Sequence, residues 1–192
     1  MSFLDSLLAT RDKLKPTVTS VTYADGRKYL ESSAVSKKIC ENLPGYVVDM
    51  KPDLVPCKVL DGLYLGSQDC CDRDVLNEYG IHVVLSVGVD APVKYAGFTY
   101  KFVECLDLPE TDLERCLADC LPFLTNSVEE GKRVLVHCNA GVSRSASIVI
   151  GYLMAKRSLG FDEAYSMVKG TRGCARPNAG FERFLRNLNT KK

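Results

Sequence analysis

The sequence predicts an α/β domain in which helices cover both faces of a central mixed, mostly parallel sheet. Short apolar runs typical of buried strands alternate along the chain with stretches whose apolar residues recur at helical spacing. One such run, over 134–136, leads through a short polar loop into a mostly apolar helical stretch over 145–157. The 192 residues suffice for one domain of this class with a sizeable core and a short extension.

The extension comprises residues 1–52, and the main domain is expected over 53–192. Within the extension, two β-prone runs over 19–29 flank an Asp-Gly pair, which predicts a hairpin. The basic segment 37–39 is interpreted as a solvated helix face, with a docking motif for a protein kinase as the alternative.

The main domain opens on a predicted hairpin, because two apolar runs over 57–65 flank the turn-forming pair Asp61-Gly62. A helix is expected over 68–79. Buried strands are expected over 81–88 and 99–105, where apolar and β-branched residues dominate.

The longest predicted helix follows these strands. Thr111 and Glu114 have the spacing of a capping box, and apolar residues then recur at helical spacing up to Val128. Pro122 interrupts this pattern and predicts a kink or a break, because proline lacks the N–H that the helix needs. After the polar loop, three more helices are expected, over 145–157, 161–169 and 178–188.

The composition is that of an ordinary soluble globular protein, with 46% hydrophobic and 26% charged residues. A net charge of +1 gives no whole-chain field for nucleic acid or an anionic membrane, so neither is an expected partner and any anion must be recognised locally. The N-terminus lacks the basic and apolar regions of a signal peptide, and no apolar run approaches membrane-spanning length. We therefore expect a cytoplasmic protein that also has access to the nucleus.

Nine cysteines are many for this length, and the count is odd. Several fall inside apolar patterns, including Cys105, Cys116 and Cys120, which indicates reduced cysteines used as small hydrophobic residues. No CxxC pair favours zinc, and neither a metal nor a cofactor is expected. A regulatory disulfide that involves Cys138 is the alternative.

The polar loop after 134–136 has the features of an anion site. A buried strand, a tight glycine-containing loop and a helix N-terminus direct backbone N–H groups and the positive end of the helix dipole toward one point. Cys138 begins the loop and Arg144 ends it, and the five residues between them can surround one tetrahedral anion. Arg144 can hold two oxygens of that anion at once. The same groups stabilise a thiolate, so Cys138 is a candidate nucleophile beneath the anion.

The segment His137-Cys138-x-x-Gly141-x-x-Arg144-Ser145 resembles the signature of the cysteine-based protein tyrosine phosphatases. Its Ala-Gly-Val-Ser-Arg-Ser portion is the form seen in their dual-specificity branch, and the resemblance runs from about residue 55 to 188. It implies the tyrosine-phosphatase-like fold of the dual-specificity type. It also implies metal-free hydrolysis of phosphotyrosine, phosphoserine and phosphothreonine through a phosphocysteine on Cys138. The residues implied to bind phosphate are Asn139, Ala140, Gly141, Val142, Ser143 and Arg144.

The resemblance also implies roles for residues around this phosphate loop. Asp107 stands where the family has its general acid, which protonates the leaving oxygen, with Glu110 and Asp112 as the next candidates. His137 is implied to orient the loop and tune the cysteine, although a histidine at a strand end is more often structural. Ser145 is implied to donate a hydrogen bond to the departing thiolate, with a helix N-cap as the competing role.

Near the end of the chain, a Pro-Asn-x-Gly-Phe segment also matches the dual-specificity pattern. Asn178 in this segment is implied to brace the phosphate loop through backbone hydrogen bonds, with a helix N-cap as the alternative, and Arg172 is interpreted as structural. The sequence departs from the family at Ser86, where an Asn is usual, and at Phe184, where a Gln is common. Neither departure is expected to touch the chemistry.

The glutamine loop and the phosphotyrosine-selective loop of the classical tyrosine phosphatases are absent from the sequence, so a shallower site that admits phosphoserine and phosphothreonine is expected. The phosphate loop has no lysine, which disfavours lipid substrates. The resemblance, strongest to an atypical branch member that regulates a stress-activated kinase pathway, implies phosphorylated proteins as partners, among them kinases of a MAP kinase pathway. The alternatives are a phosphatase of a non-protein phosphate ester and a scaffold that binds phosphoproteins or kinases.

Overall fold

In a computed structural model of the protein, the structure describes residues 19–22, 28–31, 36–40 and 53–188, with side chains described over 53–188. The chain divides into two compact units, 1–43 and 44–192. The predicted boundary between residues 52 and 53 falls beside the undescribed segment 41–52 and stays a prediction.

The first unit contains a three-stranded antiparallel sheet in the order β1-β2-β3. Its strands are β1 (Thr19–Thr22), β2 (Lys28–Glu31) and β3 (Ser36–Cys40). The pairing of β1 with β2 confirms the predicted hairpin, whose Asp-Gly turn lies outside the described residues. The helix interpretation of 37–39 is wrong, because this segment gains ladder hydrogen bonds as a strand beside β2, and such tertiary pairing overrides weak local preference.

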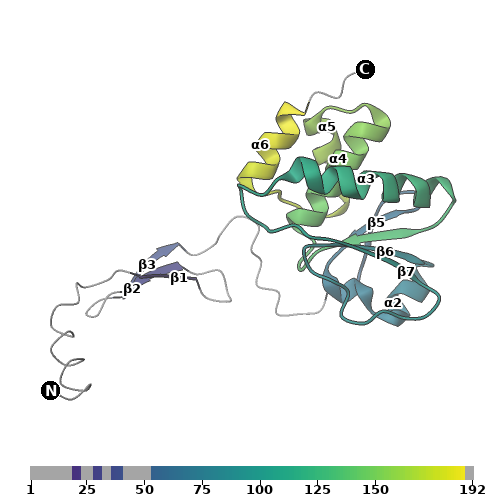
Figure 1. Ribbon diagram of the computed structural model, residues 1–192, viewed down its shortest axis with the longest axis horizontal. Coiled ribbons are helices and arrows are strands. Elements are labelled where there is room, and N and C mark those ends of the chain that lie inside the picture. The colour runs from purple at the N-terminus through teal and green to yellow at the C-terminus, as the bar shows by residue number, and fades with distance from the viewer. Residues whose placement is uncertain (1–18, 23–27, 32–35, 41–52, 189–192) are drawn as a thin grey trace, which may run out of the picture. The chain divides into compact units, whose positions relative to one another are not determined.

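The second unit is built on a five-stranded sheet in the order β4-β5-β8-β6-β7, with β8 at its centre (Figure 1). The strands are β4 (Cys57–Leu60), β5 (Leu63–Gly66), β6 (Val83–Val87), β7 (Thr99–Val103) and β8 (Val134–His137). Only β4 runs antiparallel to its neighbour, and the other pairs are parallel. This arrangement confirms the predicted mixed, mostly parallel sheet and the hairpin at its start.

Helices cover both faces of this sheet, as predicted (Figure 1). One face carries α3 (Leu113–Glu129), α4 (Arg144–Arg157), α5 (Phe161–Thr171) and α6 (Ala179–Asn187). The other face carries η1 (Gln68–Cys71) and α2 (Arg73–Glu78). Within the described residues, no helix has the length and hydropathy needed to cross a bilayer.

Alternation along the strands divides the apolar residues into two cores. In β8, Val134 and Val136 join the core beneath α3 to α6, whereas Leu135 between them joins the core beneath α2. Successive side chains of a strand point to opposite faces, so a strand covered on both sides is apolar throughout. Every residue of β8 is buried, which fixes the position of the loop that follows it.

Three local predictions are corrected. The expected single helix over 68–79 is two short helices, because the carboxylate of Asp72 accepts hydrogen bonds from two backbone N–H groups and starts α2 anew. The expected capping box at Thr111 is absent, since Asp112 caps α3 by accepting from the Arg115 N–H. At Pro122 the predicted break is absent, because α3 is continuous through it and the burial of its apolar face compensates for the missing hydrogen bond. The kink, the other outcome predicted there, stays a prediction.

We predict that Leu85→Ala in β6 lowers the free energy of unfolding by about 2–5 kcal/mol, because it leaves a cavity in a tightly packed core. Leu85 is fully buried. Urea denaturation followed by circular dichroism measures the change. The control is Val93→Ala at a side chain that is 51% exposed, and a Leu85→Ala protein as stable as this control would contradict the packing described here.

Candidate active site

The phosphate loop connects the end of β8 to the start of α4, as the sequence predicts. Cys138 follows β8 directly and is only 2% exposed. Gly141 has a φ of +64°, and a Cβ atom there would lie 2.5 Å from the carbonyl oxygen of Gly66. The loop therefore requires a glycine both for its left-handed backbone and for its contact with β5.

Six consecutive carbonyls of this loop, from Cys138 to Ser143, accept hydrogen bonds from groups outside it. The donors, in order along the loop, are His137 Nδ1, the Gln68 N–H, Arg172 Nη2, Arg172 Nε, the Arg176 N–H and the Ser147 N–H. In a planar trans peptide, the N–H points opposite to the carbonyl. The N–H groups of the loop therefore turn toward its interior, which is the arrangement that binds an anion.

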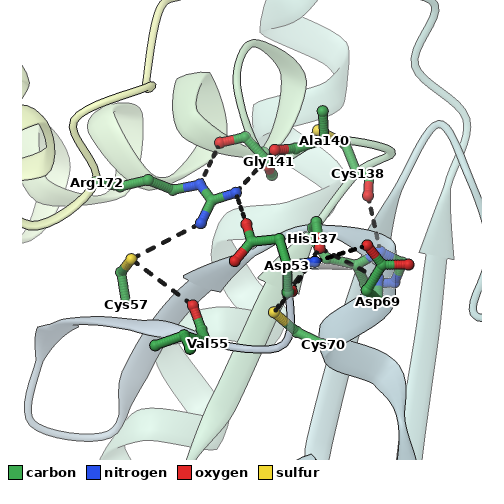
Figure 2. Close-up of polar contacts among 12 residues, drawn as sticks. Asp53, Val55, Cys57, Asp69, Cys70, His137, Cys138, Ala140, Gly141 and Arg172 are labelled. Atoms are coloured by element: carbon green, nitrogen blue, oxygen red, sulfur yellow. Dashed lines mark hydrogen bonds and ion pairs between the residues drawn. The ribbon is translucent and has the colours of Figure 1, made fainter. Parts of the chain in front are cut away.

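Arg172 supplies two of these hydrogen bonds, each 2.8 Å long, to the carbonyls of Ala140 and Gly141 (Figure 2). Its side chain is 4% exposed, and Nη2 also donates to Asp53 Oδ2 at 2.5 Å. Burial disfavours the charged guanidinium, but the hydrogen bond and the charge of Asp53 outweigh burial and raise the pKa of Arg172 above its ordinary value. These contacts agree with the interpretation of Arg172 as structural, and they show that the structure it supports is the phosphate loop itself.

Asp53 is itself fixed by its neighbours, as Figure 2 shows. Its carbonyl accepts from Ser67 Oγ at 3.0 Å and from Cys70 Sγ at 3.1 Å, and its N–H donates to the carboxylate of Asp69. The aspartate was not identified from the sequence, because nothing in its neighbourhood indicates a partner 119 residues away.

His137 is fully buried at the end of β8. Burial lowers the pKa of His137 below its ordinary value, so the ring is neutral at neutral pH. A carbonyl only accepts, so Nδ1 carries the proton toward Cys138 O, and Nε2 accepts from Ser86 Oγ at 2.8 Å. The hydroxyl of Ser86 thereby fixes the tautomer of the histidine beside the cysteine, a supporting role that the sequence does not reveal.

Ser145 donates from Oγ to Cys138 Sγ over 3.1 Å, the geometry implied for a hydroxyl that stabilises a thiolate. Its competing role as a helix N-cap is excluded, because Ser143 occupies the N-cap position of α4 and Ser145 lies inside the helix. Phe184 packs against the main core, in line with its expected lack of a role in the chemistry.

The carboxylate of Asp107 lies against the phosphate loop, although it comes from a separate segment, the acid loop, which comprises residues 104–112 between β7 and α3. Asp107 Oδ1 accepts from Ser143 Oγ at 2.6 Å and from Asn178 Nδ2 at 2.9 Å, and Oδ2 lies 3.6 Å from Arg144 Nε. Of the alternative acids, Glu110 is exposed, and the Asp112 side chain caps α3. Asp107 is thus the carboxylate that the structure places at the loop.

Asn178 performs both of the roles considered for it. Its side-chain oxygen caps α6 by accepting from the N–H groups of Gly180 and Phe181, and its own N–H donates to Ser143 Oγ in the phosphate loop. A Cβ on Gly180 would lie 2.0 Å from the carbonyl oxygen of Pro109, so this glycine permits the acid loop to rest on α6. The segment therefore positions the acid as well as the phosphate loop.

Arg144 has an unused hydrogen-bond donor. Its Nε is the one buried side-chain nitrogen or oxygen without a hydrogen-bond partner within the described residues. The side chain is 15% exposed and passes close to Gly88, where a Cβ would lie 2.7 Å from Nη1. A buried donor without a partner costs free energy, and an anion in the loop would satisfy it.

These residues can bind a tetrahedral anion over a nucleophilic sulfur and supply a carboxylic acid beside it. Between residues 53 and 188, no group of three or more His, Cys, Asp or Glu side chains has an arrangement that could hold a metal ion. The geometry thus brings together all the predicted site residues, and it adds Arg172, Asp53 and Ser86 to them.

Comparison with known proteins gives consistent matches. A family model described as "Dual specificity phosphatase, catalytic domain" matches residues 63–191. The mouse protein "Dual specificity protein phosphatase 19" is 36% identical over 192 residues, covering 95% of this chain and 87% of that protein. The human "Dual specificity protein phosphatase 22" is 36% identical over 132 residues, covering 68% and 72% of the two chains. The mouse match also reaches into the extension, where the sequence resemblance had not been drawn.

Solved structures of phosphatase-type proteins also match this chain. The crystal structure of DUSP15 matches with a TM-score of 0.64 and 34% identity over 68% of this chain and 85% of that one. A human "tyrosine phosphatase-like serine/threonine/tyrosine-interacting protein" matches with a TM-score of 0.64 and 30% identity over 68% and 93% of the two chains.

We predict that Asp53→Ala weakens binding of inorganic phosphate and lowers the free energy of unfolding by about 1–3 kcal/mol. The substitution leaves the buried guanidinium of Arg172 without its carboxylate and loosens its hold on the loop carbonyls. Calorimetric phosphate titration and urea denaturation measure the two effects. Asp61→Ala removes an exposed ion pair with Lys58 and serves as the control. If the two variants had the same phosphate affinity and the same free energy of unfolding, the contact between Asp53 and Arg172 would be dispensable.

Proposed function

This chain belongs to the dual specificity phosphatase family, and on that premise we propose how its own residues remove phosphate from proteins. Membership of this family identifies the chain as a protein phosphatase whose substrates are phosphorylated proteins. The proposal concerns the mechanism, the residues that carry it and the class of phosphoprotein.

In the first step, the Cys138 thiolate attacks the phosphorus of the bound phosphoester. A sulfur–phosphorus bond forms, the bond to the substrate oxygen breaks, and Asp107 transfers its proton to that oxygen. The N–H groups of the loop and the guanidinium of Arg144 hold the remaining phosphate oxygens through the transfer. The products are the dephosphorylated protein and a phosphocysteine.

In the second step, water attacks the phosphocysteine. Asp107, now a carboxylate, accepts a proton from that water, and the sulfur leaves as a thiolate to which Ser145 Oγ donates a hydrogen bond. His137 transfers no proton, because its ring is neutral and both nitrogens already have hydrogen-bond partners. Its part is to fix the position of the first loop carbonyl.

One observation supports this proposal above the others. Asp107 comes from a separate loop, yet two hydrogen bonds hold its carboxylate against Ser143 and Asn178, beside Arg144. The Asp107 carboxylate lies 3.6 Å from Arg144 Nε, too far for a hydrogen bond, so this donor stays available for the phosphate. A general acid has to be there, since it must reach the oxygen that leaves the phosphate.

For the substrate, we propose phosphotyrosine together with phosphoserine and phosphothreonine in kinases of a MAP kinase pathway, encountered in the cytoplasm and also in the nucleus. Support comes from the sequence, which lacks the loops that make classical tyrosine phosphatases selective. The similarity to the mouse protein over 95% of this chain favours a function shared with that relative.

Two alternatives remain as outcomes of the tests. A phosphatase of a non-protein phosphate ester would hydrolyse small esters but not phosphopeptides. A binding scaffold is a real option for this fold, because one matching structure is titled an interacting protein. The retention of Cys138, Arg144 and Asp107 in one site favours an enzyme over a scaffold.

We predict that Cys138→Ser abolishes steady-state hydrolysis of p-nitrophenyl phosphate while binding of inorganic phosphate persists. A serine hydroxyl is not ionised at neutral pH, whereas the N–H groups of the loop are unchanged. Arg144→Lys should lose both turnover and binding, because a lysine cannot hold two oxygens at once. Substantial turnover by Cys138→Ser would show that another residue is the nucleophile. Normal rates for Arg144→Lys would contradict the proposal that Arg144 binds two phosphate oxygens at once.

We predict that Asp107→Asn slows hydrolysis of a phosphotyrosine peptide by roughly 10²–10⁴-fold and affects p-nitrophenyl phosphate much less. A poor leaving group needs the proton, whereas p-nitrophenolate departs without it. Initial rates on the two substrates, measured at one neutral pH, give the two losses. Equal losses on both substrates would move the acid role to Glu110 or Asp112.

A further inference from the structure

We propose that Cys105 and Cys116 form a two-thiol site that a hydroperoxide oxidises to a disulfide, and that this disulfide displaces the acid loop. The first part rests on the arrangement of the two thiols alone. The second part rests on the proposed function, because it takes Asp107 as the general acid.

The two cysteines stand at the two ends of the acid loop. Cys105 follows β7 and precedes Asp107 by two residues, and Cys116 lies near the start of α3. Cys116 Sγ contacts the carbonyl oxygen of Glu104 at 3.6 Å, and Glu104 is bonded directly to Cys105. This contact places the Cys116 sulfur beside the main chain of Cys105, and both cysteines line the same surface cavity.

A surface cavity of about 390 Å³ gives both thiols a path to solvent. Its lining residues are Glu104, Cys105, Leu106, Thr111, Asp112, Arg115, Cys116 and Asp119. The side chains themselves are almost fully buried, so the cavity reaches them from one side. A hydroperoxide as small as hydrogen peroxide fits such a cavity.

The surroundings of the two thiols make one of them ionise more readily than the other. Interaction with the Cys105 thiol lowers the pKa of Cys116 below its ordinary value, despite burial and the nearby carboxylates of Asp112 and Asp119. Interaction with Cys116, together with burial, raises the pKa of Cys105. Burial raises the pKa of the neighbouring Cys120 to about 12. Cys116 is therefore the sulfur that ionises and attacks, while Cys120 stays an inert thiol.

The reaction balances with one hydroperoxide. The Cys116 thiolate attacks one peroxide oxygen and breaks the O–O bond, which gives a sulfenic acid and, from hydrogen peroxide after protonation, one water. The Cys105 thiol then attacks that sulfur, forms the S–S bond and releases a second water. Two electrons leave the thiol pair and reduce the peroxide. A dithiol reductant reverses the change by thiol–disulfide exchange.

The disulfide should act on catalysis through Asp107. An S–S bond is about 2.05 Å long, so two free thiols must draw together to form one and would pull the adjoining acid loop with them. Asp107 lies two residues from one of those ends, and a displacement of about 1 Å can cost on the order of 10²-fold in rate. The oxidised enzyme should therefore resemble an enzyme without its acid, not one without its nucleophile.

Mapping the disulfide tests the first part without any measurement of activity. The full chain is treated with graded hydrogen peroxide in inorganic phosphate, which occupies the Cys138 loop, then alkylated and digested with trypsin. Cleavage after Arg115 separates peptide 102–115 from peptide 116–132, so a disulfide joins the two. Peptide 116–132 also contains Cys120, which requires variants to assign the bond.

We expect the cross-linked pair in the wild type and in Cys120→Ala, and its loss in Cys116→Ala and Cys105→Ala. Cys116→Ser and Cys105→Ser repeat the test with a smaller change in volume. The proposal is overturned if the pair does not form at peroxide doses that oxidise Cys138 in phosphate-free samples. It is equally overturned if the cross-link survives in Cys116→Ala and disappears in Cys120→Ala.

Turnover of the phosphate-protected, oxidised enzyme tests the second part. We expect hydrolysis of a phosphotyrosine peptide to fall at least about 10-fold more than hydrolysis of p-nitrophenyl phosphate. Dithiothreitol should restore it, and Cys105→Ala should resist the loss. A mapped disulfide with unchanged turnover, or with equal losses on both substrates, would refute the coupling to the acid loop. If the enzyme lacked phosphatase activity altogether, the disulfide result would still stand, so the two failures are distinguishable.

Discussion

The hydrogen bonds that turn the phosphate-loop carbonyls outward are the constraint on which the rest of the site depends. A carbonyl oxygen that pointed inward would repel both a phosphate and a thiolate, so each one needs a donor elsewhere. Arg172 supplies two of those donors from the end of α5, and Asp53 holds its charge in place from before β4. The anion site is therefore made by the fold as a whole, although its chemistry lies in one short segment.

The acid and the phosphate loop share their supports. Ser143 Oγ donates to Asp107 and accepts from the N–H of Asn178, and the side chain of Asn178 donates to the same carboxylate. Glycine at position 180 lets the acid loop lie on α6. A shift of any one of these elements would move both the proton donor and the anion site, which explains why the geometry needs several contacts that no single motif contains.

The sequence predicted the parts of the site that depend on local order. The strand, the loop and the helix around Cys138 are adjacent in the chain, so their apolar pattern and signature were sufficient to place Arg144 and Ser145. Asp107 and Asn178 came from the family resemblance. Asp53 and Ser86 were missed or undervalued, because their roles arise from partners that only the sheet order brings near. The error at Thr111 has a local cause, since a cap at Thr111 and one at Asp112, a single residue apart, are too close in energy for a pattern to separate.

The central position of β8 has a consequence for how the protein is made. Its neighbours β5 and β6 precede it in the chain, while Arg172 and Asn178 follow it, so the catalytic loop closes only after nearly the whole domain has left the ribosome. Long-range parallel pairing of this kind forms slowly. A nascent chain would thus carry a cysteine without an ordered anion site around it, and the hydrolytic centre would arise only as the domain is completed.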